Sequence, residues 1–240
     1  MPEYPPPTPE SLDGQPLDER REAISSARVL LGFVATFTAL LSAAHLMTHE
    51  DIEASVTQET LRRVEEVLPP SLYDNALLED ALVMPATPAL GQSTEHTVYR
   101  ARLKGQPSAA VVEAIAPDGY AGRIRLILAI SSDQKLLGVR VIEHKETPGL
   151  GDYIDPRKDK QKANPWISQF TQLTLSDLTE TDWRVRKDGG QFDSRTGATI
   201  TPRAIVKAVH KAEQFVTLNW ETLFASKETP PDQKREREKP

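Results

Sequence analysis

The sequence predicts an α+β protein in which an N-terminal transmembrane helix precedes a domain with a mainly antiparallel, twisted sheet flanked by helices. Three observations support this class. An uncharged apolar run fills residues 29–47, short alternating segments separated by turn residues begin near residue 97, and a helical apolar pattern covers residues 202–224. With 240 residues, the chain is long enough for one medium domain with a real core plus appendages.

Composition excludes several functional classes. The net charge is −6 and no basic stripe with interleaved aromatic residues is present, so we do not expect nucleic-acid binding. The chain contains no cysteine, which excludes a cysteine-ligated iron–sulfur cluster, a thiol nucleophile and a disulfide. The sequence contains no dinucleotide fingerprint, P-loop or nucleophile elbow. We therefore assign this chain neither catalytic residues of its own nor a metal site.

The apolar run at residues 29–47 predicts a membrane span. At about 1.5 Å per residue it covers roughly 28 Å, close to the hydrocarbon thickness of a bilayer. Arginines precede the run and carboxylates follow it, so the positive-inside rule places the N-terminus in the cytoplasm and the rest outside. The alternative is a signal peptide cleaved near Ala44. We favour a retained anchor because the run continues past Ala44 and the leading segment is long for a signal peptide.

Shifts in composition divide the chain into five parts. They are a disordered cytoplasmic arm (1–28), the transmembrane helix (29–47), a helical stalk and connector (51–96), a folded domain (97–226) and a disordered tail (227–240).

Within the folded domain, strands are expected at residues 97–104, 109–116, 123–131 and 136–143, and a short helix is expected around 166–173. Ile124, Leu126, Leu128 and Ile130 alternate with Arg123 and Arg125, which predicts a sheet with one buried face.

The segment at residues 193–202, DSRTGATITP, is the first candidate site. Thr201 has the chemistry of a helix N-cap, and Pro202 suits the first helical position. Thr199 is therefore expected just before a helix N-terminus, where free N–H groups and the helix dipole favour an anion such as phosphate. A threonine hydroxyl there can contact a phosphate or be esterified to it. From spacing alone, helix capping is the commoner role of such a threonine-rich segment.

The segment at residues 144–152, HKETPGLGD, is the second candidate site. Its Thr-Pro-Gly step is turn chemistry, because proline fixes φ and glycine tolerates positive φ. Two glycines flank Leu150 and allow backbone to lie close against a planar ligand with one apolar face. An ordinary tight turn after a strand is the simpler alternative.

Taken together, the two motifs resemble the G subunit of the Rnf electron-transport complex. That family carries a [Ser/Thr]-Gly-Ala-Thr signature whose last threonine holds FMN through a phosphoester, and Thr199 occupies this position here. The Glu-Thr-Pro-Gly-Leu-Gly loop lines the FMN in this family and in the related C subunit of the sodium-translocating NADH:quinone reductase. The run at 118–122 and the Thr-Gly-Ala-Thr-Ile-Thr-Pro-Arg ending are closer to the Rnf protein. The resemblance covers about residues 29–224.

This resemblance implies a flavoprotein subunit of an electron-transport translocase, which moves electrons between ferredoxin and NAD and couples them to sodium or proton movement. It implies covalent FMN on Thr199 and places the chain in the bacterial inner membrane, with a cytoplasmic N-terminus and a periplasmic FMN domain. The other implied cofactor-binding residues are Thr196, Gly197, Ala198 and Thr201 from the first motif, and Glu146, Thr147, Gly149 and Leu150 from the second.

The hydroxyls of Thr196 and Thr201 are expected to donate hydrogen bonds to the phosphate. The implied partners are the other membrane subunits, including a second FMN-carrying subunit, and a flavin transferase for which Asp193 serves as a recognition residue. Two alternatives stay open: the C subunit of the quinone reductase, and a membrane-tethered binding or assembly module without a cofactor.

Overall fold

A computed structural model of the chain describes residues 15–225. The chain forms two compact units that divide between Thr57 and Gln58. The first helix, α1 (Gln15–Glu65), supplies the described part of the first unit and the opening residues of the second.

The first unit contains an apolar helical segment whose described side chains are all exposed. Residues 23–47 of α1 contain an 18-residue stretch with a mean hydropathy of 1.9, and none of its residues is buried. Within the part of the chain that the structure describes, this is the one helix long and apolar enough to cross a membrane. Leu31, Phe33 and Leu46 are exposed although all three are large and apolar. Exposure of this kind suits a lipid environment and is costly in water.

The arm differs from the sequence expectation. Residues 15–28 are helical, so the disorder predicted through residue 28 is wrong from Gln15 onward. Adding turns to an existing helix avoids the cost of nucleation, and this stretch is rich in good helix formers such as Glu, Arg and Ala. The rest of the predicted arm, residues 1–14, lies outside the described residues, as does the tail from residue 226.

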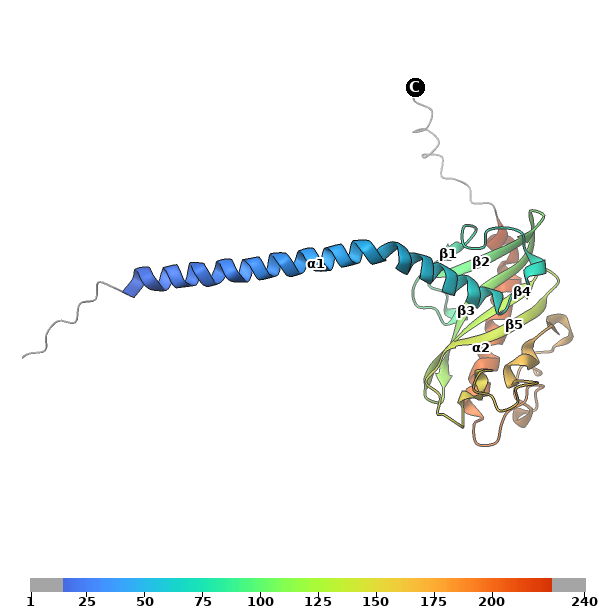
Figure 1. Cartoon of the computed structure of the whole chain (residues 1–240). Helices are drawn as coiled ribbons and strands as arrows, with labels where there is room; N and C mark the ends of the chain where they lie inside the picture. The colour runs from blue at the N-terminus through green and yellow to red at the C-terminus, as the bar shows by residue number, and fades with distance from the viewer. Residues whose placement is uncertain (1–14, 226–240) are drawn as a thin grey trace, which may run out of the picture. The chain divides into compact units, whose positions relative to one another are not determined.

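The second unit is built on one antiparallel sheet in which every strand pairs with its neighbour in sequence (Figure 1). The strands are β1 (Leu82–Met84), β2 (His96–Leu103), β3 (Gln106–Gly119), β4 (Gly122–Ser131), β5 (Lys135–Glu143) and β6 (Leu173–Thr174). The four strands predicted from alternation correspond to β2 through β5. Structure and sequence agree on an α+β fold.

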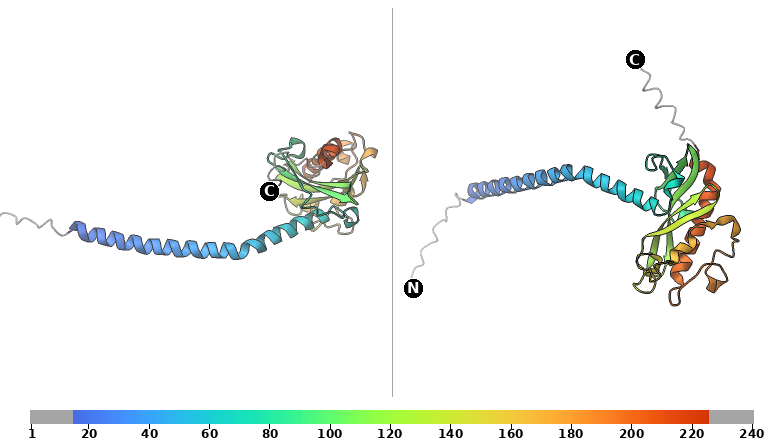
Figure 2. Two further views of the ribbon diagram at one scale, coloured as in Figure 1. Left: turned by 90° about the horizontal axis from the view of Figure 1, so that it is seen from above. Right: turned by 45° about the vertical axis from the view of Figure 1, so that its right-hand side comes forward.

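Helix α2 (Ile200–Phe224) covers one face of this sheet, as two further views show (Figure 2). Its apolar residues, including Ile205, Val209 and Val216, form one core with Ile124 and Leu128 of β4. The side chains predicted to face one way along β4 are thus buried together. The helix begins two residues earlier than the predicted 202.

The opposite face of the sheet is also covered, contrary to the sequence expectation. Val64, Val67 and Leu68, at the end of α1 and just after it, pack against Ile127 and Ala129 of β4. All five side chains are at most 3% exposed. The prediction of a single buried face is therefore wrong, because the strand reads as a continuous apolar run from Leu126 to Ile130 and such runs are buried on both sides.

Short 3₁₀ helices connect these elements. They are η1 (Pro70–Leu72), η2 (Pro88–Leu90), η3 (Asp152–Ile154), η4 (Trp166–Phe170), η5 (Leu175–Asp177) and η6 (Arg186–Asp188). The helix expected at 166–173 is the five-residue η4. The connections between β5 and α2 gather around the N-terminal end of α2, where both sequence motifs lie (Figure 1).

Candidate functional site

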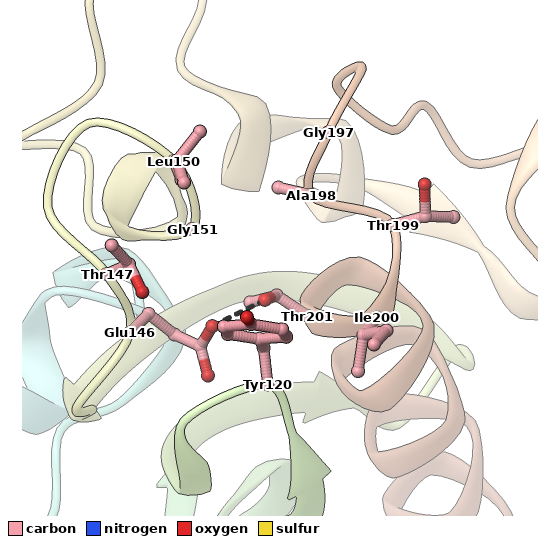
Figure 3. A pocket seen from close by; sticks show the side chains of 10 residues that line it. All are labelled: Tyr120, Glu146, Thr147, Leu150, Gly151, Gly197, Ala198, Thr199, Ile200 and Thr201. Atoms are coloured by element: carbon pink, nitrogen blue, oxygen red, sulfur yellow. Dashed lines mark hydrogen bonds between the residues drawn. The ribbon is translucent and has the colours of Figure 1, made fainter.

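The two motifs lie about 40 residues apart in sequence, yet both line a single cavity of about 130 Å³ (Figure 3). Three segments form its walls: the tip of the β3–β4 hairpin, the loop after β5, and the start of α2 with the loop before it. The lining residues are Tyr120, Glu146, Thr147, Leu150, Gly151, Gly197, Ala198, Thr199, Ile200 and Thr201.

Two β-turns face each other across the cavity. In the first, the Leu150 N–H donates to the Thr147 carbonyl (3.1 Å) and Gly149 has a φ of +77°. In the second, the Ala198 N–H donates to the Arg195 carbonyl (3.2 Å) and Gly197 has a φ of +88°. A positive φ at the third turn position is typical of type II turns and selects glycine there.

The geometry of the two turns explains why each motif has a glycine followed by an apolar residue. In each, the residue after the glycine, Leu150 or Ala198, carries an apolar side chain toward the other turn over the top of the cavity (Figure 3). The cavity thus has an apolar upper wall.

Glu146 connects the three segments below this wall. Its side chain is only 4% exposed. One carboxylate oxygen accepts a hydrogen bond from the Ala121 N–H (3.1 Å), and the other accepts one from the Thr201 hydroxyl (2.6 Å). A buried carboxylate is stable only when its oxygens have such partners. Glu146 therefore fixes the hairpin tip and the start of α2 to its own loop.

The residue at the N-cap of α2 differs from the one predicted from the sequence. Thr199 occupies the N-cap position and makes no side-chain capping hydrogen bond. Thr201 lies inside the helix, 1% exposed, with its hydroxyl committed to Glu146. The prediction that Thr201 caps the helix is wrong, because its hydroxyl has a buried carboxylate as partner. The Thr201 hydroxyl was also expected to donate to a phosphate, but its single proton is already donated to Glu146.

Thr199 combines accessibility with an uncapped helix start. Its side chain is half-buried and points away from the centre of the cavity, on the outer side of the chain (Figure 3). The first turn of α2 contains no acidic residue. The first N–H groups of a helix lack partners within the helix, so this end is suited to an anion.

Most of the residues predicted to bind a cofactor line the cavity, and two do not. Thr196 is exposed and lies outside the lining, as does Gly149, whose N–H donates to Asp152 (2.8 Å). Gly149 thus shapes the turn that carries Leu150.

Three lining residues are not among the nine predicted cofactor-binding residues: Tyr120, Gly151 and Ile200. Tyr120 is 67% exposed at the tip of a two-residue hairpin loop, and a large exposed aromatic side chain in such a turn is a usable signal. A Cβ added to Gly151 would lie 2.7 Å from a carboxylate oxygen of Glu146, so a side chain there would have to displace that carboxylate. The sequence alone does not show why residue 151 is a glycine, because the reason depends on where the Glu146 side chain lies.

The charged groups around the site are mostly paired. On α2, Arg203 pairs with Asp188 (2.5 Å) and Lys207 pairs with Asp118 (2.9 Å). His144 accepts the Glu146 N–H through Nδ1 (3.1 Å). Burial, reinforced by the nearby Lys158 charge, lowers the pKa of His144 below its ordinary value, which favours the neutral ring that this bond requires.

Size alone would not single out this cavity. A groove lined by Arg62, Arg140 and Arg157 measures about 310 Å³, and a hollow lined by Gln161, Gln169 and Ser194 measures about 250 Å³. Neither receives side chains from both motifs. The smaller cavity is the candidate site because seven of the nine predicted cofactor-binding residues line it.

Residues 119–214 match the family described as "FMN-binding domain", a range that includes both motifs and the hairpin tip. The fold and the site therefore define an FMN-binding flavoprotein domain.

Whole-chain relatives narrow this class. A protein of Pseudoalteromonas atlantica, named as the G subunit of an ion-translocating oxidoreductase complex, is 40% identical over 207 residues, covering 86% of this chain and 94% of that protein. Proteins of the same name from Aliivibrio fischeri (42% identical over 198 residues; 82% and 92% covered) and Pseudomonas aeruginosa (41% over 209 residues; 87% and 95% covered) are also similar. The chain belongs to the family of G subunits of ion-translocating oxidoreductase complexes, which confirms the resemblance found from the two motifs.

Proposed function

We propose that this chain is an electron-carrying subunit of an ion-translocating ferredoxin:NAD oxidoreductase and that it holds FMN as a phosphoester on Thr199. One observation carries the proposal. The two motifs converge on one cavity, at whose rim Thr199 presents a hydroxyl that makes no capping bond, at the N-terminus of α2. The names of the relatives favour the G subunit over the quinone-reductase C subunit. The FMN-binding domain favours a flavoprotein over a module without cofactor.

The residues present fit part of an FMN molecule. Pockets that enclose a ligand of drug size usually hold about 300–1,000 Å³, so a cavity of about 130 Å³ covers only part of a flavin nucleotide. Tyr120 and Leu150, 67% and 54% exposed, offer apolar surface for the face of a ring beside the cavity. A partly exposed ring suits a carrier that must exchange electrons with other proteins. Bound FMN supplies the chemistry, because it accepts and releases electrons one at a time.

Attachment needs an activated flavin donor and a separate enzyme. In the proposed step, Oγ1 of Thr199 attacks the flavin-side phosphorus of a flavin dinucleotide held by a flavin transferase. The Oγ1–P bond forms, the anhydride P–O bond breaks, and the nucleoside monophosphate leaves with the electron pair. The hydroxyl proton passes to a base of the transferase, and nothing is oxidised or reduced. The outward direction of the Thr199 side chain supports access by such an enzyme (Figure 3).

The chain's own residues have structural tasks in this proposal. Glu146 and Thr201 hold the loop after β5 against α2. The uncapped N-terminus of α2 stabilises the remaining charge on the phosphate. Asp193, whose side chain pairs with Arg186 (2.8 Å), serves transferase recognition.

The membrane complex determines where the domain works. We propose that residues 29–47 span the bacterial inner membrane, with the N-terminus in the cytoplasm and the FMN domain in the periplasm. The partners are the other membrane subunits, one of which carries a second FMN. The helix is long and apolar enough for this role, and the positive-inside rule gives the orientation. A reporter fused to the C-terminus is expected to be active only outside the cytoplasm, and activity inside would reverse the orientation.

The attachment site has a direct test. The full chain is co-expressed with a flavin transferase, denatured, separated by electrophoresis and viewed under ultraviolet light. The wild-type chain is expected to give a fluorescent band, and Thr199→Val is expected to lose it. Ser194→Ala is the control, because it removes a hydroxyl of the same loop that lies outside the signature and does not line the cavity. A band that persists in Thr199→Val would contradict the assignment, as would a dark wild-type chain.

A further inference from the structure

We propose that Arg195 is a positioning residue for flavin attachment: it clamps the turn before Thr199 to the segment after β5 and so holds the acceptor hydroxyl in place. This inference rests on the proposed function. Four residues form the clamp, namely Tyr153, Asp159, Trp166 and Arg195. None of the four is among the residues proposed to bind FMN.

The Tyr153 hydroxyl holds both ends of the turn. It accepts a hydrogen bond from the Arg195 N–H (3.4 Å) and donates one to the Ala198 carbonyl (3.2 Å). Arg195 and Ala198 are the first and last residues of the turn. Tyr153 itself is only 3% exposed, so it offers a rigid point of attachment. Thr199 follows Ala198 directly, and its position depends on this contact.

The Arg195 side chain makes the second attachment. Its guanidinium lies over the Tyr153 ring, 4.5 Å from the ring centroid, and forms an ion pair with Asp159. The Asp159 side chain is fully buried and also accepts the N–H groups of Gln161 (2.8 Å) and Trp166 (2.7 Å). Burial raises the pKa of Asp159, but these N–H donors and the Arg195 charge outweigh it and hold the pKa below its ordinary value. The anchor is therefore a charged, fully partnered carboxylate.

The start of the motif is attached to the same cluster. The Trp166 indole N–H donates to the Asp193 carbonyl (2.7 Å), and its ring packs edge-on against Tyr153. The loop is thus held at Asp193, at Arg195 and at Ala198. The acceptor residue comes immediately after the last of these points.

Arg195 acts on Thr199 only through this backbone. It does not line the FMN cavity and lies instead in the separate hollow of about 250 Å³, on the Asp193 side of the loop. Group transfer is sensitive to small displacements of the attacking atom, and a shift of about 1 Å can cost roughly 100-fold in rate. Loosening the clamp is therefore expected to slow attachment without removing any group that contacts the flavin.

The test compares three variants of the full chain in detergent: Arg195→Gln, Arg195→Lys and the control Arg157→Gln. Arg157 serves as the control because it also pairs with a buried aspartate, Asp155 (3.0 Å), but its side chain is 81% exposed and lines the separate groove with Arg62 and Arg140. Each purified chain without flavin is incubated with a flavin transferase and flavin dinucleotide. Covalent flavin is followed over time by in-gel fluorescence at several chain concentrations. Melting curves establish a temperature at which every variant is folded.

For Arg195→Gln we expect kcat for attachment to fall about 10- to 100-fold with KM for the chain unchanged. Arg195→Lys should recover part of the rate, since it keeps the charge but loses the planar contact with Tyr153. Arg157→Gln should load like the wild type. Unchanged loading of Arg195→Gln would overturn the proposal, and so would an equal loss in Arg157→Gln. A rise in KM alone would also overturn it, because Arg195 would then be a transferase contact. If the wild-type chain fails to load, the proposed function fails instead.

Discussion

Replacing Thr201 by valine separates the structural hydroxyl of the site from the hydroxyl proposed for attachment. Valine keeps the shape of threonine and removes only the hydroxyl, so the change deletes the 2.6 Å hydrogen bond to the carboxylate of Glu146. Both side chains are buried, at 1% and 4% exposure, so water cannot readily replace the lost donor. Of the two donors that hold its carboxylate in the wild type, Glu146 then keeps only the Ala121 N–H.

The size of the effect follows from this geometry. A hydrogen bond to a charged group contributes about 1.5–3 kcal/mol to stability. For a domain of this size, each kcal/mol moves the melting temperature by about 2–4 °C. Thr201→Val is therefore expected to lower the melting temperature by roughly 3–12 °C. Thr199→Val, which removes a hydroxyl without a capping bond, should change stability by less than about 0.5 kcal/mol.

The assay is thermal unfolding of the full chain in detergent, followed by tryptophan fluorescence. All three tryptophans, Trp166, Trp183 and Trp220, belong to the second unit, so the signal reports the domain that contains the site. The same preparations are tested for covalent flavin. The two variants should behave in opposite ways: Thr201→Val melts early but still acquires flavin, whereas Thr199→Val melts normally and does not. A melting temperature of Thr201→Val within about 1 °C of the wild type would refute the reasoning.

Two further predictions concern the rest of the second unit. Leu68→Ala should destabilise the domain by about 2–5 kcal/mol in denaturant unfolding, because Leu68 is fully buried on the sheet face opposite α2. A loss of stability below about 1 kcal/mol would argue against a second core on that face. Burial lowers the pKa of His96, His144 and His210 below the ordinary 6.5, so the unfolded chain takes up protons first as pH falls. Stability should therefore be level above about pH 6.5 and decrease below it. His210→Phe should make this decrease smaller. A melting temperature that stays constant from about pH 7.5 to 5.5 would contradict the prediction.

The sheet was largely predictable because its signal is local. Alternation of apolar and polar residues located β2 through β5 within a few residues of their true ends. The second buried face was missed because it depends on Val64, near the end of α1, and Leu68, just after it, which are far from β4 in the sequence. Periodicity within one strand does not reveal what packs on it.

The same limit applies to the site. Thr199 was singled out by its place before a predicted helix, and both Thr199 and Glu146 were assigned to the cofactor through the resemblance of their motifs to a known family. The bond between Glu146 and Thr201 joins residues 55 positions apart, and no spacing rule predicts it. Without that bond, an N-cap was the reasonable assignment for Thr201, and Tyr120 had no visible connection to the two motifs.

The neighbour-to-neighbour order of the strands has a consequence for the timing of maturation. Pairings between adjacent segments close short loops and form early in folding, whereas α2 comes last in the chain and packs across strands made long before it. As the chain emerges during synthesis, the sheet can assemble while Thr199, the proposed acceptor, is still unmade or undocked. The proposed flavin attachment is then a late event that marks a finished domain, and a count of covalent flavin per chain would also measure how much of the protein has folded.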